Sequence, residues 1–389
     1  MATFALSLDR SNRIYRIAVG CLFFMMGLCF ATWASRIPTI QQRLHLSDAA
    51  LGAVLFALPV GSMLSLPFCG WMVTKFGSKR VVTNAVILYS ILLIGLGFSK
   101  SLPQLVITLI LFGAAGNTSN IAVNTQAVGV EARYGRSIMA SFHGLWSLAG
   151  FTASGIGNFM IGRNIVPSNH FLIITAFILC GVAISFHYLL PAEDTKPEKA
   201  RLFPKMNKSL LTLGVITFCS MICEGTMFDW SGIYFKKIVK ADQEWIGVGL
   251  WAFMCTMATG RFVADRVAHK IGFKRTVQGS GVLIATGLAI AVLLPYLATA
   301  IVGFLLVGFG VSSVVPLVYS EAGKSKTIAP GLALAAVSSI GFLGFLIGPP
   351  LIGIVAGLAG LQVSFTLIAM MGLCVAVAAS GRLVPGRAA

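Results

Sequence analysis

The sequence predicts an all-α membrane protein whose twelve helices cross the bilayer as two pseudo-symmetric six-helix bundles. Charged residues make up 11% of the 389-residue chain and hydrophobic residues 57%, whereas a soluble domain carries about 25% charged residues. Apolar stretches near or above about 18 residues, long enough to cross the hydrocarbon core as a helix, recur along the chain. A central polar stretch, "PAEDTKPEKARLFPKMNK" (191–208), divides these runs into two sets of six.

Six spans are expected in the first half, because each run is long and apolar enough to cross the bilayer. In chain order they are residues 17–35, 50–73, 81–99, 103–130, 137–161 and 169–190. The first follows basic residues, as in a signal peptide, but "CFATWASR" carries no cleavage pattern, so we expect a retained helix. The second and third flank a basic loop, the fourth ends at Glu131, and the sixth ends at the polar stretch.

Six further spans are expected in the second half on the same grounds. In chain order they are residues 208–234, 244–267, 275–293, 296–320, 331–357 and 361–381. The eighth and ninth flank a second basic loop, Pro295 divides the ninth from the tenth, and the tenth ends at Glu321. No segment shows the sustained polar–apolar alternation of membrane strands, which argues against a barrel. The eight cysteines all lie in apolar segments and are expected to be free thiols.

The net charge of +17 fits the positive-inside rule better than it fits nucleic-acid binding. With the N-terminus inside, 22 of the 29 lysines and arginines, Arg261 among them, fall in inner segments. The outer segments hold Arg36, Arg43, Lys100, Arg163, Lys236, Lys237 and Lys240. We therefore expect a multi-pass protein of the cytoplasmic (inner) membrane, embedded in lipid, with both termini cytoplasmic and no nucleic-acid partner.

The two halves repeat at a fixed offset. "GWMVTKFGSKR" begins at Gly70 and "GRFVADRVAHKIGFKR" begins 190 residues later at Gly260. "EARYGR" at Glu131 and "EAGKSK" at Glu321 are separated by the same 190 residues. Parallel repeats of this kind are a transporter plan, with the binding site near the midplane. The expected domains are an N-terminal half (1–190), a cytoplasmic linker (191–207) and a C-terminal half (208–389).

These features resemble a known family. Twelve spans, a central loop and glycine- and arginine-containing loops after spans 2 and 8 resemble the major facilitator superfamily over essentially the whole chain. Within it, "ATWASRIP" (31–38), "EGTMFDW" (224–230) and "FLIGPPLIG" (345–353) look like the fucose-permease-like branch of bacterial permeases. The resemblance implies alternating access, a cavity lined by spans 1, 4, 7 and 10, and symport of a sugar or similar small polar solute.

The two loops depart from the family pattern to different degrees. The first has Thr74 and Lys75 where the family usually has Asp and Arg, while the second keeps its aspartate, Asp265. An inner gate is therefore expected to centre on Asp265, with Glu131 and Glu321 forming ion pairs at nearby helix ends. The residues expected at the inner gate are Gly70, Lys75, Gly77, Arg80, Glu131, Arg133, Asp265, Arg266 and Glu321.

Polar side chains inside the spans are candidates for solute binding, because they are costly in lipid and by default face a cavity or the bundle interior. Asn117, Asn120 and Asn124 share one helix face. They line a cavity for hydroxyl-rich or zwitterionic solutes, or they hydrogen-bond packed helices; both interpretations stay open. Trp33 stacks a sugar ring or anchors at the interface, and His143 titrates or bonds a neighbouring helix. The remaining expected substrate-binding residues are Glu224 and Tyr319.

Two acids in the seventh span play different expected roles. Glu224 and Asp229 are five residues apart, so they point about 140° apart on a helix and do not form one site. Glu224 lies deeper and is the candidate for proton coupling; a neutral glutamic acid that braces the bundle is the alternative. Asp229 and Arg36 lie at one level near the outer boundary, where we expect them to pair as an outer gate. Two separately solvated charges are the alternative there.

The expected function is secondary active transport without enzymatic activity, cofactor or metal. No Walker-type phosphate loop occurs, so ATP bound by this chain is not expected to drive transport. The coupling ion is expected to be a proton, with Na⁺ as the alternative, and the protein is expected to be a monomer. A proton-driven exporter of drugs or metabolites is the alternative function. Span 5 lacks the glycine-proline signature of many drug antiporters, which weakens that alternative.

Overall fold

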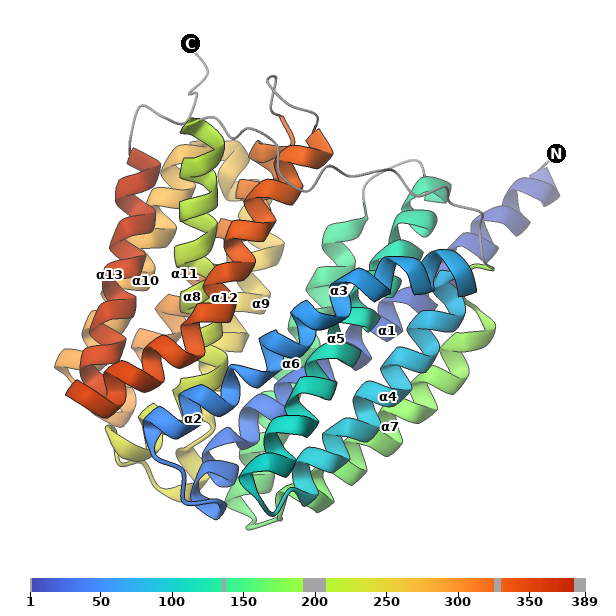
Figure 1. Cartoon of the computed structure of the whole chain (residues 1–389). Helices are drawn as coiled ribbons and strands as arrows, with labels where there is room; N and C mark the ends of the chain where they lie inside the picture. The colour runs from blue at the N-terminus through green and yellow to red at the C-terminus, as the bar shows by residue number, and fades with distance from the viewer. Residues whose placement is uncertain (1, 135–137, 192–207, 325–329, 381–389) are drawn as a thin grey trace. The chain divides into compact units, whose positions relative to one another are not determined.

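The computed structural model describes residues 2–134, 138–191, 208–324 and 330–380, and the backbone over these ranges is helical with no strand (Figure 1). The elements are α1 (Ala2–Arg43), α2 (Asp48–Leu55), α3 (Ala57–Phe76), α4 (Ser78–Phe98), α5 (Leu102–Tyr134), α6 (Met139–Gly162), α7 (Pro167–His187), α8 (Lys208–Lys237), the short 3-10 helix η1 (Gln243–Trp245), α9 (Val248–Ile271), α10 (Phe273–Leu293), α11 (Leu297–Ala322), α12 (Pro330–Ala359) and α13 (Leu361–Ser380).

The predicted all-α fold with twelve spans is confirmed, with α2 and α3 together forming the second span. Eleven of the described segments are long and apolar enough to cross a membrane by length and composition. The twelfth span is α6, which is outside those eleven although it has 24 residues. Its glycines, serines and asparagine lower its hydropathy, because small and polar residues replace the large aliphatic ones.

The second span is broken at Phe56, which the sequence did not predict. Pro59 lies in the first turn of α3, where a missing backbone N–H costs little. A continuous helix would place the proline ring against the carbonyl of Leu55, four residues earlier, and would leave that carbonyl without its helical partner. The chain therefore ends one helix at Leu55 and begins the next at Ala57.

Two compact units divide the chain by contact. One comprises Met1–Ile40 and Ala57–Pro197, and the other comprises Gln41–Phe56 and Glu198–Ala389. This division differs from the sequence repeat in one segment, because Gln41–Phe56 groups with the second unit. The predicted linker falls almost wholly on residues 192–207, which lie outside the described residues.

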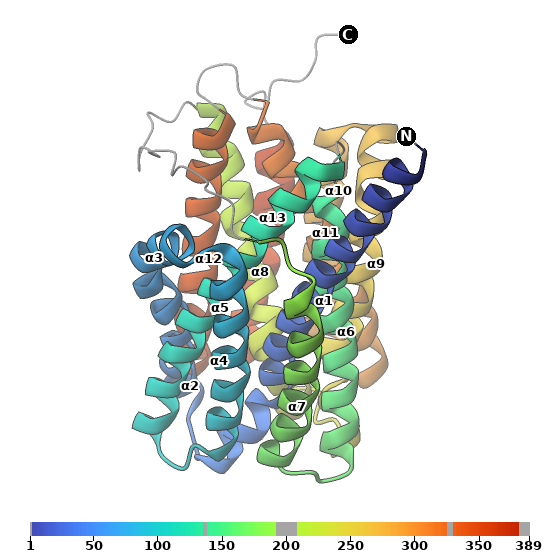
Figure 2. The ribbon, with the colours of Figure 1, turned by 90° about the vertical axis from the view of Figure 1, so that its right-hand side faces the viewer.

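In the first unit, α5 packs along both α3 and α4, and α4 packs along α7 (Figure 2). The approach of α3 to α5 depends on two glycines. A Cβ atom at Gly61 would lie 1.8 Å from the carbonyl oxygen of Ile110, and one at Gly113 would lie 1.9 Å from that of Leu58. Lipid is as apolar as the core, so close packing through small residues is what holds such helices together.

In the second unit, α12 packs along α8, α11 packs along both α9 and α10, and α13 packs along α10. Apolar side chains from α8, α10, α11, α12 and α13 form one buried cluster in this unit. The short helix α2 meets α12 (Figure 1), where the Cβ positions of Gly52 and Gly353 lie against each other's backbone. A salt bridge of 2.6 Å from Lys237, at the end of α8, to Asp48 also ties α2 to this unit.

The sequence repeat is also present in the backbone conformation. Gly77 separates α3 from α4 with φ 79° and ψ 146°, and Gly272 separates α9 from α10 with φ 88° and ψ 154°. Positive φ strains any residue with a Cβ, so the repeated loops require glycine at these positions. Each glycine is followed after one residue by Lys-Arg, in "GSKR" and "GFKR".

Candidate functional site

A buried ion pair joins Glu224 of α8 to Arg261 of α9 within the second unit. The Oε1 atom of Glu224 lies 3.5 Å from Nη2 of Arg261, and the two side chains are 11% and 17% exposed. In the salt bridges from Lys237 to Asp48 and from Lys324 to Glu321, the lysines are 41% and 67% exposed. Water therefore screens the Glu224–Arg261 pair less, and removing one of its charges costs more than at an exposed pair.

Helix lengths explain why these two side chains meet. Glu224 lies 13 residues before the end of α8 at Lys237, and Arg261 lies 13 residues after the start of α9 at Val248. At about 1.5 Å per residue, each is about 20 Å from the connection between the two helices. The charge count placed Arg261 with the inner segments, although Arg261 falls within the predicted span 244–267. In the structure it lies inside its helix, at the depth of Glu224.

Tyr319 of α11 is a further polar side chain near Glu224. It is half-buried against the core cluster, and Glu224 acts on it electrostatically. A carboxylate accepts hydrogen bonds and can take up a proton, a guanidinium donates up to five N–H bonds, and a phenol both donates and accepts. The carboxylate on α8, the guanidinium on α9 and the phenol on α11 can therefore bind a polar solute and a proton at one site.

The three asparagines of the fourth span, α5, separate into two roles. The Nδ2 atom of Asn117 donates to the backbone oxygen of Ser62 (3.0 Å) and to Oγ of Ser65 (2.9 Å), both on α3. Asn117 thus hydrogen-bonds a packed neighbouring helix, which is one of the two interpretations left open for these asparagines. Asn124 donates instead to its own helix, to the backbone and side-chain oxygens of Asn120, and Asn120 is exposed. Solute binding by Asn120 and Asn124 stays a prediction.

The two expected aromatic and imidazole ligands of the first unit differ in access. Trp33 is 2% exposed and its indole nitrogen has no hydrogen-bond partner among the described residues, so in this structure its ring has no face free to stack on a sugar. His143 of α6 is exposed and lies edge-on to the ring of Phe23 on α1, with 5.3 Å between ring centroids. A role for His143 in binding stays a prediction.

Arg36 of α1 is held inside the first unit by two hydrogen bonds. Its Nε donates to Nδ1 of His170 at 3.1 Å, and its Nη2 donates to the backbone oxygen of Ile165 at 2.8 Å. Both Arg36 and His170 are buried. Asp229 is half-buried in α8 of the second unit. Because Arg36 and Asp229 belong to different units, their pairing as an outer gate stays a prediction.

The first basic loop is exposed at the positions assigned to the inner gate. No atom lies within 4 Å of a Cβ placed at Gly70. Lys75 extends over the ring of Trp71, with Nζ 4.8 Å from the centroid, and Arg80 is exposed in the first turn of α4. Gly77 supplies the left-handed conformation between α3 and α4. Their part in gating stays a prediction.

The other expected gate residues lie at helix ends. Oε2 of Glu131 accepts hydrogen bonds from the backbone nitrogens of Ile138 (2.7 Å) and Met139 (2.9 Å), so its carboxylate caps the start of α6. Arg133 lies over the ring of Tyr15 at 5.2 Å. Glu321 forms a 2.9 Å salt bridge with Lys324, three residues on. Arg266 is exposed on α9, and the side chain of Asp265 lies outside the described residues.

Two residues of these sites were not predicted from the sequence. Arg261 was missed because the charge count grouped it with the inner segments, although it falls within the predicted span 244–267 and counting residues from the helix start places it at depth. His170 follows Pro167 closely in "PSNHF", and no spacing singles it out as the partner of Arg36. No group of three or more metal-binding side chains occurs in the described part of the chain.

Comparisons with known proteins agree with the fold. A sequence profile described as Major Facilitator Superfamily matches residues 6–327. An uncharacterized MFS-type transporter of Yersinia pestis is 32% identical over 369 residues, which cover 95% of each chain. The membrane protein MosC of Rhizobium meliloti is 31% identical over 93% of this chain and 88% of its own. A mutant of the nucleoside transporter NupG shares the fold, with a TM-score of 0.74 at 14% identity over 93% of this chain and 99% of that one.

Proposed function

The chain belongs to the major facilitator superfamily, and we propose that this transporter moves a small polar solute by alternating access, coupled to protons. Uptake by symport is the direction we propose. Membership of the family makes the chain a multi-pass membrane transporter and not an enzyme. The identity of the solute, the coupling ion and the direction of transport are what we propose beyond family membership.

The observation that carries the proposal is the buried pair of Glu224 and Arg261. A carboxylate inside a membrane protein is costly and by default functional. Arg261, at 3.5 Å, stabilises Glu224 in its ionised form, and this stabilisation is lost when Glu224 binds a proton. Proton binding therefore releases the guanidinium for another acceptor, such as a solute. Proton uptake and solute binding are coupled in this way at one site.

A small polar solute suits this group of side chains. Glu224, Arg261 and Tyr319 together offer donors and acceptors for hydroxyl groups or for a zwitterion. The exposed amide of Asn120 and the half-buried amide of Asn124 add further polar surface in the first unit. A sugar-like solute is the class we propose.

The proposal also includes sidedness and gating. We place the protein in the cytoplasmic membrane as a monomer, with the basic loops inside according to the charge distribution. Arg36 and Asp229 act as an outer gate, and Asp265 with its neighbours acts as an inner gate. Charge reversal at both Arg36 and Asp229 should restore function lost in each single variant; absence of rescue would count against that pair.

A ligand screen followed by uptake measurements tests the function. Purified protein is heated with sugars, polyols, amino acids and lipophilic cations, and solutes that raise its melting temperature are then tried in proteoliposomes. We expect stabilisation by a polar solute and faster uptake when the outside is acidic. Stabilisation by lipophilic cations alone would contradict the solute class. Uptake that follows a Na⁺ gradient and ignores pH would contradict proton coupling.

The control for substitutions at Glu224 is Glu244→Gln, which changes an exposed acid in η1.

A further inference from the structure

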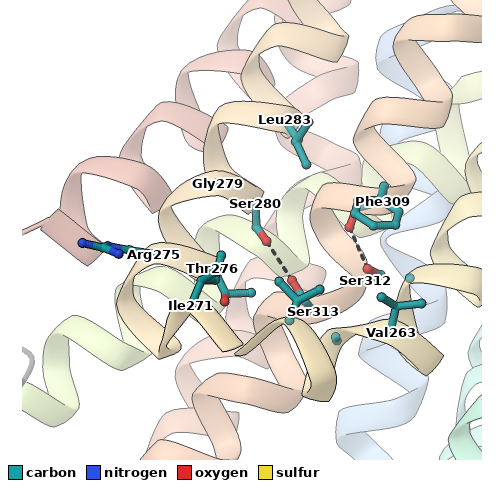
Figure 3. A pocket seen from close by; sticks show the side chains of 13 residues that line it. Val263, Ile271, Arg275, Thr276, Gly279, Ser280, Leu283, Phe309, Ser312 and Ser313 are labelled. Atoms are coloured by element: carbon teal, nitrogen blue, oxygen red, sulfur yellow. Dashed lines mark hydrogen bonds between the residues drawn. The ribbon is translucent and has the colours of Figure 1, made fainter. Parts of the chain in front are cut away.

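A groove lies between α9 and α10 of the second unit, with α11 as its floor (Figure 3). Its volume is about 180 Å³. The floor forms because α11 packs extensively along both helices, whereas α9 and α10 touch each other little beyond their connection at Gly272. Glycines widen the groove further. Gly279 of α10 is part of its wall, and no atom lies within 4 Å of a Cβ placed there.

The groove presents hydrocarbon rather than hydrogen-bonding groups. Val263, Leu283 and Phe309 come from the three helices and line it together (Figure 3). Its hydroxyl groups are already engaged: Ser280 and Ser313 share a hydrogen bond of 2.7 Å. The hydroxyls of Ser312 and Thr276 likewise donate to backbone oxygens, at 2.6 and 2.9 Å. A polar solute would therefore find few hydrogen-bond partners in the groove. An alkyl chain needs none, so it can bind there without leaving a polar group unpaired.

Basic side chains stand at the end of the groove near Gly272. Arg275 contributes to its wall and marks one edge in Figure 3, and Lys270 and Lys274 are exposed close by in sequence. No aspartate or glutamate occurs between Arg266 and Ser320 in the sequence. The acids that flank this stretch are Asp265 and Glu321, and Glu321 is paired with Lys324. The first turn of α10 also disfavours cations by its dipole, so helix stability does not explain Lys274 and Arg275 there.

We propose that this groove binds one anionic phospholipid. One acyl chain lies along the apolar wall between α9 and α10, and the phosphate lies against Lys274 and Arg275. Basic pockets between membrane helices attract anionic headgroups in this way, because charge and hydrocarbon are presented at matching depths. The site is separate from the pair of Glu224 and Arg261 and does not depend on the proposed solute or coupling ion.

Two kinds of variant distinguish binding of the acyl chain in the groove from binding of the headgroup by the basic side chains. Gly279→Leu places a side chain in the groove. A Cβ at this position meets no atom within 4 Å, and leucine is a better helix former than glycine, so the fold should survive. Lys274→Gln with Arg275→Gln removes the charges and leaves the groove open. The matched controls are Val282→Leu, which adds bulk at an exposed position on α10, and Arg80→Gln, the equivalent loop arginine of the first unit.

Titration of detergent-purified full-length protein tests the proposal, with phosphatidylglycerol or phosphatidylcholine of identical acyl chains added before native mass spectrometry. We expect the parent protein to retain one phosphatidylglycerol in preference to phosphatidylcholine. The preference should fall about fivefold for each charge removed, and Gly279→Leu should abolish it while both controls keep it. Equal retention of the two lipids by the parent, as for annular lipid only, overturns the proposal. Preference that survives Gly279→Leu also overturns it, because the headgroup would then bind without the groove.

Discussion

A double-mutant cycle on Glu224 and Arg261 gives the sharpest prediction for the energetics of the site. At the observed 3.5 Å, two unit charges attract by about 5 kcal/mol at an effective dielectric of about 20. Desolvation of both groups opposes this, so the whole attraction is not gained as stability. Arg261→Gln leaves the carboxylate buried without its counter-charge, and we expect it to lose about 3–5 kcal/mol of unfolding free energy.

The double variant, with glutamine at both positions, should recover most of that loss, because no charge is then left buried. A coupling free energy of about 3 kcal/mol is therefore expected. Unfolding in mixed detergent micelles can be followed by a thiol-reactive dye, since Cys29, Cys69 and Cys223 are free and buried in the fold. Coupling below about 0.5 kcal/mol would show instead that water screens the pair as it screens a surface pair.

An exposed pair provides the matched control for this cycle. Glu321 and Lys324 lie at a comparable distance, 2.9 Å, but their side chains are 20% and 67% exposed. The same glutamine substitutions there should show a coupling of at most about 1 kcal/mol. Equal coupling in the two pairs would mean that burial does not strengthen the pair of Glu224 and Arg261.

Two further predictions concern packing in the first unit, and the same unfolding assay measures both. Gly61→Ala should destabilise by about 1–3 kcal/mol, because its Cβ meets the Ile110 carbonyl at 1.8 Å, whereas Gly70→Ala meets nothing and should be neutral or stabilising. Equal effects would contradict the close approach. His170→Ala should cost about 1–3 kcal/mol, because Nε of buried Arg36 loses its acceptor. His170→Asn keeps an acceptor and should cost less; equal losses would count against that bond.

The helices were predictable from the sequence because each crosses lipid as an apolar run whose length is fixed by the bilayer. The exceptions have local causes. Pro59 interrupts the second span, and the signal was present, but a proline is also tolerated in many membrane helices. The position of α2 with the second unit depends on Gly52 meeting Gly353, a contact between distant residues that no local pattern encodes.

The site was predictable only in part. The depth of Glu224 follows from counting residues along its helix, and the same count applied to Arg261 places the two charges at one depth. The positive-inside count obscured this pair, because it grouped Arg261 with the arginines outside the membrane. Asn117 shows the converse. The sequence places Asn117 on a polar helix face, but packing decides whether its amide points to a cavity or to Ser65 of another helix.

Proton coupling through Glu224 can be tested with the Glu224→Gln variant, in proteoliposomes loaded with the solute found by the ligand screen. The variant keeps hydrogen-bonding capacity at this position but cannot take up a proton. We predict that it exchanges labelled for unlabelled solute at close to the parent rate, but no longer accumulates solute when the outside is acidic. Accumulation at the parent level under the same pH gradient would contradict proton coupling through Glu224.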